Sequence, residues 1–351
     1  MITIQYLEPN AETTAVAPTK ARAKLQAAFD RLSIDAVLLG WALPESLMSA
    51  VREITHANGA KLYRWHPFLT GDGTIVPHPE WQTVSTSGER VPGFRGMPEF
   101  TFVCPNKTAV RKTILTHVQA LSQSGLYDGI FLDRMRFPSP AADLGRWLAC
   151  FCKDCQATAV QDGLDLTAVR HEIDQTLSKA GGAQLILQAF ESFQKPSRSV
   201  LSDFLAFRTR TITQLIDEAA SLIRAEGLAV GLDCFAPSLT RMVGQDLTAL
   251  SPLGDWIKVM TYAHTLGPAG LPFELLELAS WLMALDASEQ QALVWLAEAL
   301  EIPLPPNLVA LRNPGLSATA LQAEIRRAKT TVSAPLLAGI ELIDLAGVTH
   351  L

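Results

Sequence analysis

The sequence lacks the features that mark several large classes of protein. Acidic residues outnumber basic ones by 35 to 29, for a formal charge of -6, and no dense Lys/Arg run is present, so nothing favours binding to nucleic acid or to an anionic membrane. No apolar run reaches the roughly 20 residues of a membrane span. The N-terminus has no charged start followed by a long apolar core, as a secretory signal would. We therefore expect a cytoplasmic protein without nucleic-acid or membrane partners.

Several catalytic signatures are also missing. There is no G-x-G-x-x-G fingerprint for a dinucleotide, no phosphate-cradling P-loop and no G-x-S-x-G elbow of a serine hydrolase. No H-x-H or H-E-x-x-H pair is present to bind a metal that activates water. These absences argue against an organic cofactor, and they weaken the case for a metal-dependent amidohydrolase.

What the sequence does contain is an alternation of short apolar runs with longer amphipathic ones. Strands are expected over residues 34–41, 60–68, 100–106, 127–133, 228–237, 255–264 and 335–344, with a weak further one at 306–313, and helices lie between most of them. Strands separated by such helices imply right-handed crossovers and a parallel sheet. About eight units, in a fold of roughly 250 residues plus insertions, predict a (β/α)8 TIM barrel.

The whole chain, residues 1–351, is expected to form this single α/β barrel domain. Residues 138–200, after the fourth strand, are irregular and contain a cysteine cluster, so we interpret them as an insertion. A doubly wound open sheet is the alternative fold, although no dinucleotide fingerprint supports it.

Polar and aromatic side chains recur where the expected strands end. In a barrel of this type, side chains at the C-terminal ends of the strands meet in one shared cleft. The last inward positions are Trp41, Trp65 or His66, Cys104 or Asn106, Asp133, Asp233, Tyr262 or His264, and Glu341.

Three carboxylates among aromatic rings suit a sugar, because sugar rings have apolar faces edged with hydroxyl groups. Cleaving a glycosidic bond needs one carboxyl to protonate the leaving oxygen and a second to stabilise or attack the oxocarbenium-like centre. The predicted catalytic residues are Asp133, Asp233 and Glu341. The predicted substrate-binding residues are Trp41, Arg64, Trp65, His66, Arg134, Tyr262, His264 and Glu274.

Each of these residues also has a structural interpretation. Asp133 could pair with Arg134 or Arg136, Glu341 could only hold its loop, and the aromatic rings could belong to the core. Asp128 lies at the entrance of its strand, and we interpret it as structural.

The segment YDGIFLDRMRFP resembles the fourth-strand segment of glycoside-hydrolase-like TIM barrels, in which an acid after Gly-Ile-x-Leu enters the sugar cleft. VMTY is similar to the Met-Thr-Tyr of family 18 chitinases. The chitinase pattern Asp-x-x-Asp-x-Asp-x-Glu falls here on Asp128, Phe131, Asp133 and Met135, so the proton-donating glutamate of that family is missing. Over the length of the barrel, the chain resembles uncharacterised bacterial proteins of glycoside-hydrolase type.

Five cysteines occur, and three form a C-x-C-x2-C cluster at Cys150, Cys152 and Cys155. A closed tetrahedral zinc site needs a fourth ligand, and Cys104, at a neighbouring strand end, is the candidate; His171 is a weaker one. Family 42 β-galactosidases look similar, with a structural zinc on four cysteines, and this resemblance implies the ligand role for all four. Four reduced thiols without a metal remain the alternative.

These observations predict a glycoside hydrolase acting on a carbohydrate, with a structural zinc. The asparagine-glutamate acid/base of family 42 has no counterpart around Asp133. The alternatives are a barrel that binds saccharides without cutting them, and an unrelated barrel enzyme such as a lyase.

Overall fold

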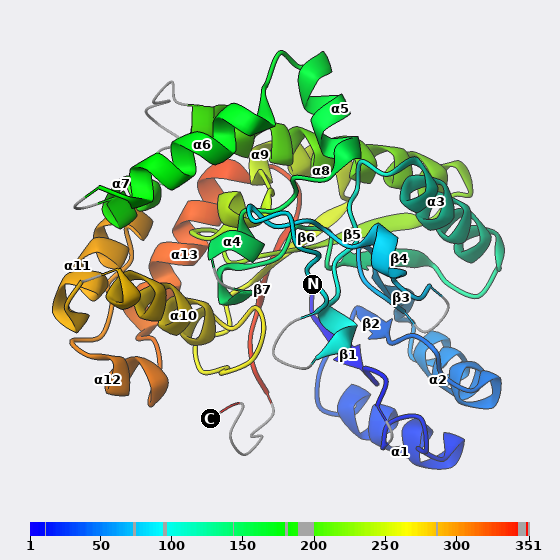
Figure 1. Cartoon of the computed structure of the whole chain (residues 1–351). Coiled ribbons are helices and arrows are strands. Elements are labelled where there is room, and N and C mark those ends of the chain that lie inside the picture. Colours follow the sequence, from blue (N-terminus) through cyan, green and yellow to red (C-terminus); the bar gives the residue numbers. More distant parts are fainter. Residues whose placement is uncertain are drawn as a thin grey trace.

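A computed structural model of the chain describes residues 1–10, 12–72, 75–93, 97–142, 144–179, 182–188, 200–285, 287–342 and 349. Its centre is one sheet of seven parallel strands that lie side by side in chain order (Figure 1). The strands are β1 (Thr3–Tyr6), β2 (Ala36–Leu39), β3 (Lys61–Pro67), β4 (Gly129–Asp133), β5 (Ala229–Cys234), β6 (Trp256–Met260) and β7 (Leu336–Gly339).

The sheet is curled like a half-barrel. Sequential parallel order with helical crossovers is the topology of a TIM barrel, so the α/β class and the barrel-like curl are confirmed. Among the described residues, β1 pairs only with β2 and β7 only with β6. An eighth strand that closes the barrel is therefore not seen in this part of the chain, and closure stays a prediction.

The strands expected from the sequence differ from the structure at three places. Residues 3–6 form β1, which the sequence pattern does not predict. Residues 100–106 join no sheet: Val103 makes only an isolated antiparallel bridge with Gln82. Residues 308–312 form a short helix, because the side chain of Asn307 accepts a hydrogen bond from the backbone N–H of Ala310 and caps it. Asp133 nevertheless lies at the end of the fourth strand, as expected. The missed strand β1 and the wrongly predicted strand at residues 100–106 both precede it, so the two errors cancel in the strand count.

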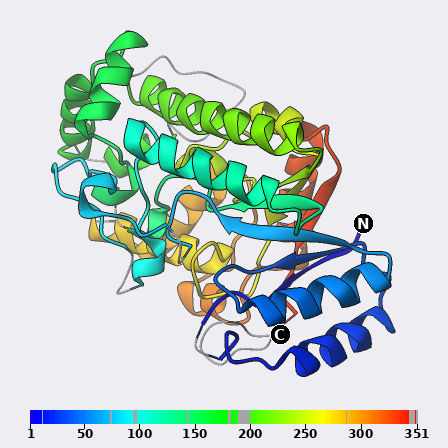
Figure 2. The ribbon, with the colours of Figure 1, turned by 90° about the vertical axis from the view of Figure 1, so that its right-hand side faces the viewer.

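Helices fill the crossovers and cover the outer face of the sheet. Figure 2 shows α1 beside α2 and α3 beside α8 on this face. The helices are α1 (Pro18–Phe29), α2 (Glu45–Ala57), α3 (Thr108–Gln123), α4 (Leu144–Trp147), α5 (Lys153–Gln161), α6 (Leu166–Leu177), α7 (Gly182–Gln188), α8 (Val200–Ala225), α9 (Leu247–Leu250), α10 (Leu271–Ala284), α11 (Glu289–Leu300), α12 (Leu308–Arg312) and α13 (Ala318–Thr331).

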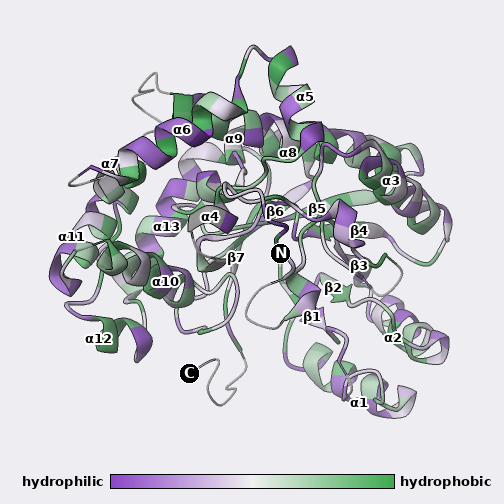
Figure 3. Ribbon diagram, viewed as in Figure 1, coloured by the Kyte–Doolittle hydropathy of each residue, from purple (hydrophilic) through white to green (hydrophobic). Residues whose placement is uncertain are grey.

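Five short 3-10 turns lie in the described loops. They are η1 (Pro79–Trp81), η2 (Pro98–Phe100), η3 (Pro140–Ala142), η4 (Thr240–Val243) and η5 (Ser251–Leu253). The helices α4 to α7 and the turn η3 lie between β4 and α8, within the stretch predicted as an insertion. Green (hydrophobic) and purple (hydrophilic) residues alternate along the helices in Figure 3, and the buried apolar side chains of helices and strands form a common core.

The inside of the curl is filled by a layer of aromatic rings. Trp65, Phe131, Gly231 and Trp256 are paired across β3 to β6, and the rings of Phe131 and Trp256 are stacked with centroids 5.0 Å apart. A Cβ atom on Gly231 would lie 2.3 Å from the Trp256 ring, so only glycine leaves room for it. The next inward residues, two positions further along these strands, lie directly above this aromatic layer.

Candidate functional site

A row of three charged side chains lies directly above the aromatic layer. Successive inward residues on a strand are two positions apart, so Asp133, Asp233 and Lys258 follow Phe131, Gly231 and Trp256. Asp233 pairs in register with Lys258, and Asp133 follows Leu132, which pairs with Leu232. The backbones of Asp133 and Asp233 therefore lie one strand spacing apart, which is about 4.8 Å. The two predicted acids Asp133 and Asp233 are brought together.

Asp133 is held by two donors. Its Oδ2 accepts a hydrogen bond of 2.8 Å from the indole Nε1 of Trp65, and its Oδ1 accepts one of 2.5 Å from the backbone N–H of Arg134. Only 6% of the residue is exposed. Both bonds fix the direction of the carboxylate, and a fixed carboxylate is what electrostatic stabilisation of a cationic centre requires.

Asp233 forms an ion pair with Lys258, with 2.9 Å between Oδ2 and Nζ. Burial raises the pKa of Asp233 to about 8, with the charge of Asp133 adding to the effect and Lys258 opposing it. Its other oxygen has no hydrogen-bond partner among the described groups. Burial therefore favours the protonated acid, while the ammonium group 2.9 Å away favours the ionised acid that the ion pair requires.

Lys258 of β6 reaches across the curl to β1. Its ammonium group also donates hydrogen bonds of 2.8 Å to Gln5 of β1 and to the hydroxyl of Tyr262. Burial raises the pKa of Tyr262 to about 12, so the phenol stays protonated. We had not selected Lys258 from the sequence, although a lysine inside the buried strand WIKVM is itself a signal.

Above the C-terminal ends of β1 to β4 lies an open cavity of about 610 Å³. Its walls include Glu8, Trp41, Glu99 and Arg134. Arg134 adopts a left-handed backbone with φ of 52°, and its guanidinium lies 5.3 Å from the Trp41 ring and 4.4 Å from the Phe100 ring. Glu8 and Glu99 were missed, because their segments are not strand ends in the sequence pattern.

Two of the predicted aromatic residues form one unit. The rings of Trp41 and Trp65 meet edge to face with centroids 5.3 Å apart. Trp41 lines the cavity, while Trp65 reaches Asp133 below it. The pair thus connects the cavity to the row of charges.

Three predicted residues after β6 and β7 hold loops. Oε1 of Glu341 accepts hydrogen bonds from the backbone N–H of His264 at 2.8 Å and from the Thr265 hydroxyl at 3.0 Å. The ring Nδ1 of His264 lies 2.6 Å from the carbonyl oxygen of Pro314. Glu274 is fully buried and accepts bonds from the backbone N–H groups of Ala141 and Ala269. Burial raises the pKa of Glu274.

Arg64 and His66 belong to another cluster. They alternate with the inward Trp65 and so point to the helix side of β3. Asp72 Oδ2 lies 3.4 Å from Arg64, 3.5 Å from Nδ1 of His66 and 2.9 Å from Nε2 of His117. The His66, Asp72 and His117 ligand atoms are close enough to share a metal ion, but Arg64 already supplies the positive charge at Asp72. We interpret the group as an ion-pair network.

Asp128 is structural, as predicted. It lies before β4, where it accepts hydrogen bonds from the backbone N–H of Leu62 at 2.7 Å and from His56 at 2.9 Å. It ties the entrance of β4 to β3, at the end of the strand opposite Asp133.

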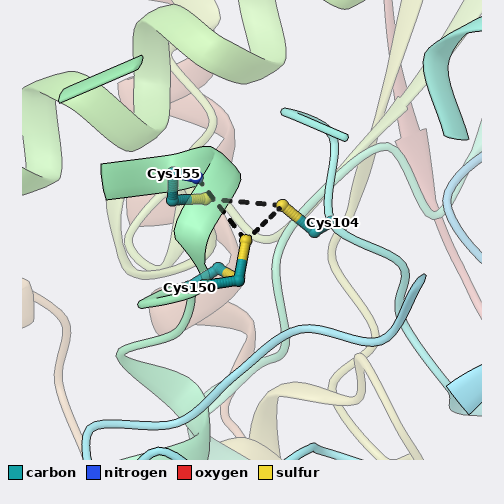
Figure 4. Close-up of side chains that lie close together, drawn as sticks. Cys104, Cys150 and Cys155 are labelled. Carbon is teal, nitrogen blue, oxygen red and sulfur yellow. Dashed lines mark hydrogen bonds between the residues drawn. The ribbon is translucent and has the colours of Figure 1, made fainter. Parts of the chain in front are cut away.

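The four predicted cysteine ligands form one buried cluster, and Figure 4 labels three of them, Cys104, Cys150 and Cys155. The Sγ of Cys104 lies 3.5 Å from that of Cys152 and 3.4 Å from that of Cys155, and all four sulfur atoms lie within 4.8 Å of one another. Four thiolates around a zinc ion at about 2.3 Å would be about 3.8 Å apart. None of the four is in a disulfide, and the group can hold one metal ion.

A buried cation, Arg208, interacts electrostatically with this cysteine cluster. Arg208 is fully buried and donates to the carbonyl oxygens of Met242 and Trp147; burial lowers the pKa of Arg208, and Cys150 and Cys155 oppose that shift. Four thiolates and a divalent ion would carry a net charge of about −2, which supplies the countercharge that buried Arg208 needs. His171 is exposed on α6 and bonds to Gln175, so it is not part of the cluster.

Comparison with known proteins shows the fold. No protein-family model and no curated protein matches the chain. Among solved structures, the PgaB (BpsB) glycoside hydrolase domain of Bordetella bronchiseptica is 14% identical, with a TM-score of 0.50 over 96% of this chain and 93% of that one. The β-galactosidases of Halorubrum lacusprofundi and Rahnella sp. R3 are 14% and 11% identical, each with a TM-score of 0.51.

The alignments to the two β-galactosidases cover 96% and 98% of this chain but only 52% and 51% of theirs. The chain therefore spans about half the length of those enzymes. At these identities the likeness establishes a glycoside-hydrolase-like fold.

In the part of the chain that the structure describes, no helix is both long and apolar enough to span a membrane.

Proposed function

We propose that the protein is a glycoside hydrolase whose reaction takes place at the C-terminal ends of β1 to β6. The observation that supports this most directly is the position of Asp133. It lies next to Asp233 in a row of charges, and it accepts a hydrogen bond from Trp65, whose ring meets that of Trp41 in the wall of a cavity of about 610 Å³. The likeness of the fold to glycoside hydrolases agrees with it.

In this proposal Asp133 stabilises or attacks the anomeric carbon of the sugar as positive charge develops there. Trp65 and the backbone N–H of Arg134 orient its carboxylate. Trp41 offers a ring face for a sugar, and Arg134 offers donors for hydroxyl groups. The sequence predicts either Asp233 or Glu341 as the proton donor, and Asp233 is the closer of the two to Asp133 in the sheet.

Binding of a saccharide without cleavage is the second candidate. It is favoured by the low exposure of Asp133, 6%, and by the fact that both of its oxygens already accept hydrogen bonds. In that case the cavity would still bind sugar, and replacing Asp133 would have little effect on affinity.

We also propose that the four-cysteine cluster holds a structural zinc ion. Four thiolates leave no open position for substrate or water, so such a site stabilises a fold and takes no part in catalysis. Here it would connect the segment before α3, through Cys104, to the residues that begin α5.

The experiment that tests the hydrolase proposal is a screen of arylglycosides and oligosaccharides with the purified protein. Asp133→Asn is assayed beside it, and Asp217→Asn, an exposed acid on α8, serves as the matched control. Turnover that is lost in Asp133→Asn alone supports hydrolysis. Saccharide binding by calorimetry with no turnover supports the second candidate, and neither binding nor turnover rejects both.

A further inference from the structure

A glycosidase needs a carboxyl group that can deliver a proton to the glycosidic oxygen, so this group must reach the substrate. Neither predicted donor, Asp233 or Glu341, lines the cavity, and nor does the predicted substrate-binding residue Glu274. Asp233 is 2% exposed, with one oxygen bound to Lys258. Glu274 is fully buried and accepts backbone hydrogen bonds. Oε1 of Glu341 holds the loop at His264 and Thr265.

The acidic residues that line the cavity are different ones. Glu8 follows β1 and Glu99 lies in η2, and both contribute to the cavity wall. About half of the Glu8 side-chain surface, 52%, is exposed. Because β1 carries Glu8 at its C-terminal end, the residue belongs to the same edge of the sheet as Asp133.

Contacts link Glu8 to Asp133. The guanidinium of Arg134 lies 2.9 Å from Oε1 of Glu8, and the backbone N–H of the same arginine holds Asp133. Partial burial raises the pKa of Glu8, Arg134 opposes this shift, and the negative charges of Asp133 and Glu99 add to it. A raised carboxyl pKa suits a proton donor. The position of Glu8 in the cavity wall, beside Arg134, is the main observation that favours this role.

We propose that Glu8 is the proton donor of this site, an assignment that rests on the hydrolase proposed above. The carboxyl proton of Glu8 goes to the glycosidic oxygen while the bond from that oxygen to the anomeric carbon breaks, and the electron pair of the bond stays on the oxygen. Asp133 stabilises or attacks the anomeric carbon. A water molecule then supplies the hydroxyl group of the sugar product, and its other proton returns to the Glu8 carboxylate.

The test compares Glu8→Gln with the unchanged protein on two arylglycosides of one sugar. A dinitrophenyl leaving group departs without protonation, whereas a phenyl or sugar leaving group needs it. Acid catalysis typically contributes about 10²–10⁴-fold. We therefore expect Glu8→Gln to lose this much kcat/KM on the poor leaving group, to stay within a few fold on the dinitrophenyl glycoside, and to lose the alkaline limb of its pH profile.

Glu12→Gln is the matched control, because Glu12 is an exposed acid four residues after Glu8 and does not line the cavity. Glu8→Asp should keep part of the activity on the poor leaving group, since the shorter side chain retains the proton. Circular dichroism and thermal melting check that each variant folds, because Glu8→Gln removes the charged partner of the largely buried Arg134.

The outcomes separate the two proposals. If Asp133→Asn abolishes turnover but Glu8→Gln loses equally on both leaving groups, or loses nothing, the Glu8 assignment is overturned and the hydrolase stands. If Asp133→Asn keeps full turnover, or the unchanged protein cleaves no glycoside, the hydrolase proposal fails and the Glu8 assignment fails with it.

Discussion

Lys258 and Asp233 form a buried ion pair between β6 and β5, with their charged atoms 2.9 Å apart. The lysine is 4% exposed and the aspartate 2%. Charges this deep in a protein are expensive unless they are paired. The pair therefore explains why a lysine is tolerated at the centre of an apolar strand.

Lys258→Met should destabilise the protein strongly, because it leaves Asp233 buried without its partner. Removal of one member of a buried pair typically costs about 3–5 kcal/mol of unfolding free energy. Chemical denaturation measures this, with Lys61→Met, at an exposed position of β3, as the control. The double variant Lys258→Met/Asp233→Leu should recover much of the loss. Equal stability of Lys258→Met and Lys61→Met would contradict the pairing.

The cysteine cluster predicts a bound metal. The purified protein should contain about one zinc ion per chain by elemental analysis, and a cobalt-substituted sample should show the strong sulfur-to-metal absorption of thiolate ligation. Cys155→Ser should lose the metal and part of its stability, because binding energy at such a site is folding energy. Cys234→Ala, at a buried cysteine outside the cluster, should keep the metal. Metal-free protein with full stability would support four simple thiols.

His66 predicts a dependence of stability on pH. Burial lowers the pKa of His66 from 6.5 to about 4, so between these values the unfolded chain binds a proton that the folded protein does not. The free energy of unfolding should therefore fall as the pH falls from about 6.5 to 4, with a slope of up to about 1.4 kcal/mol per pH unit from this group.

His66→Phe removes the titrating group while keeping a ring of similar shape, so its slope in this pH range should be smaller. Val160→Ala, at an exposed position of α5, removes no ionisable group and should leave the slope unchanged. The nearby imidazoles of His117 and His66 hold the pKa of Asp72 below its usual range, although burial opposes this. Asp72 therefore contributes to the pH dependence of stability only at lower pH, in the unchanged protein and in His66→Phe. Identical slopes for His66→Phe and the unchanged protein would refute the assignment.

Trp65→Phe should impair catalysis more than it impairs folding. It removes the indole N–H that donates to Asp133 and keeps an aromatic ring in the interior layer. A hydrogen bond to a charged group contributes about 1.5–3 kcal/mol, which corresponds to a loss of about 10- to 100-fold in kcat. Steady-state kinetics on the best substrate measures this; an unchanged kcat would show that the bond does not matter for turnover.

The position of Asp133 was predictable because several signals in its segment agree. A short apolar run ends at an acid, and the helices on either side imply parallel strands whose C-terminal ends share one edge. The cysteine cluster was predictable for a similar reason, since C-x-C-x2-C spacing restricts the ligands locally. Cys104 was predicted as the fourth ligand only because of the resemblance to family 42 β-galactosidases and because its segment was expected to lie beside the other three cysteines.

Other features were out of reach of a pattern. Residues 3–6 are too few to show an alternation, so β1 was missed, and Glu8 with it. Val309, in the apolar stretch of residues 306–313, is exposed; the stretch is a capped helical turn, and a short run does not distinguish helix from strand. Arg64 and His66 were placed in the cleft because the inward register of β3 was left open between Trp65 and His66. One residue of register decides which side of a sheet a side chain occupies.

The most direct test of the account compares kcat/KM of the unchanged protein and of Asp133→Asn on the best glycoside found by screening. If Asp133 acts on the anomeric carbon, the variant should lose at least about a thousand-fold while its melting temperature and metal content stay the same. A variant that turns over the same glycoside within twofold of the unchanged protein would contradict it.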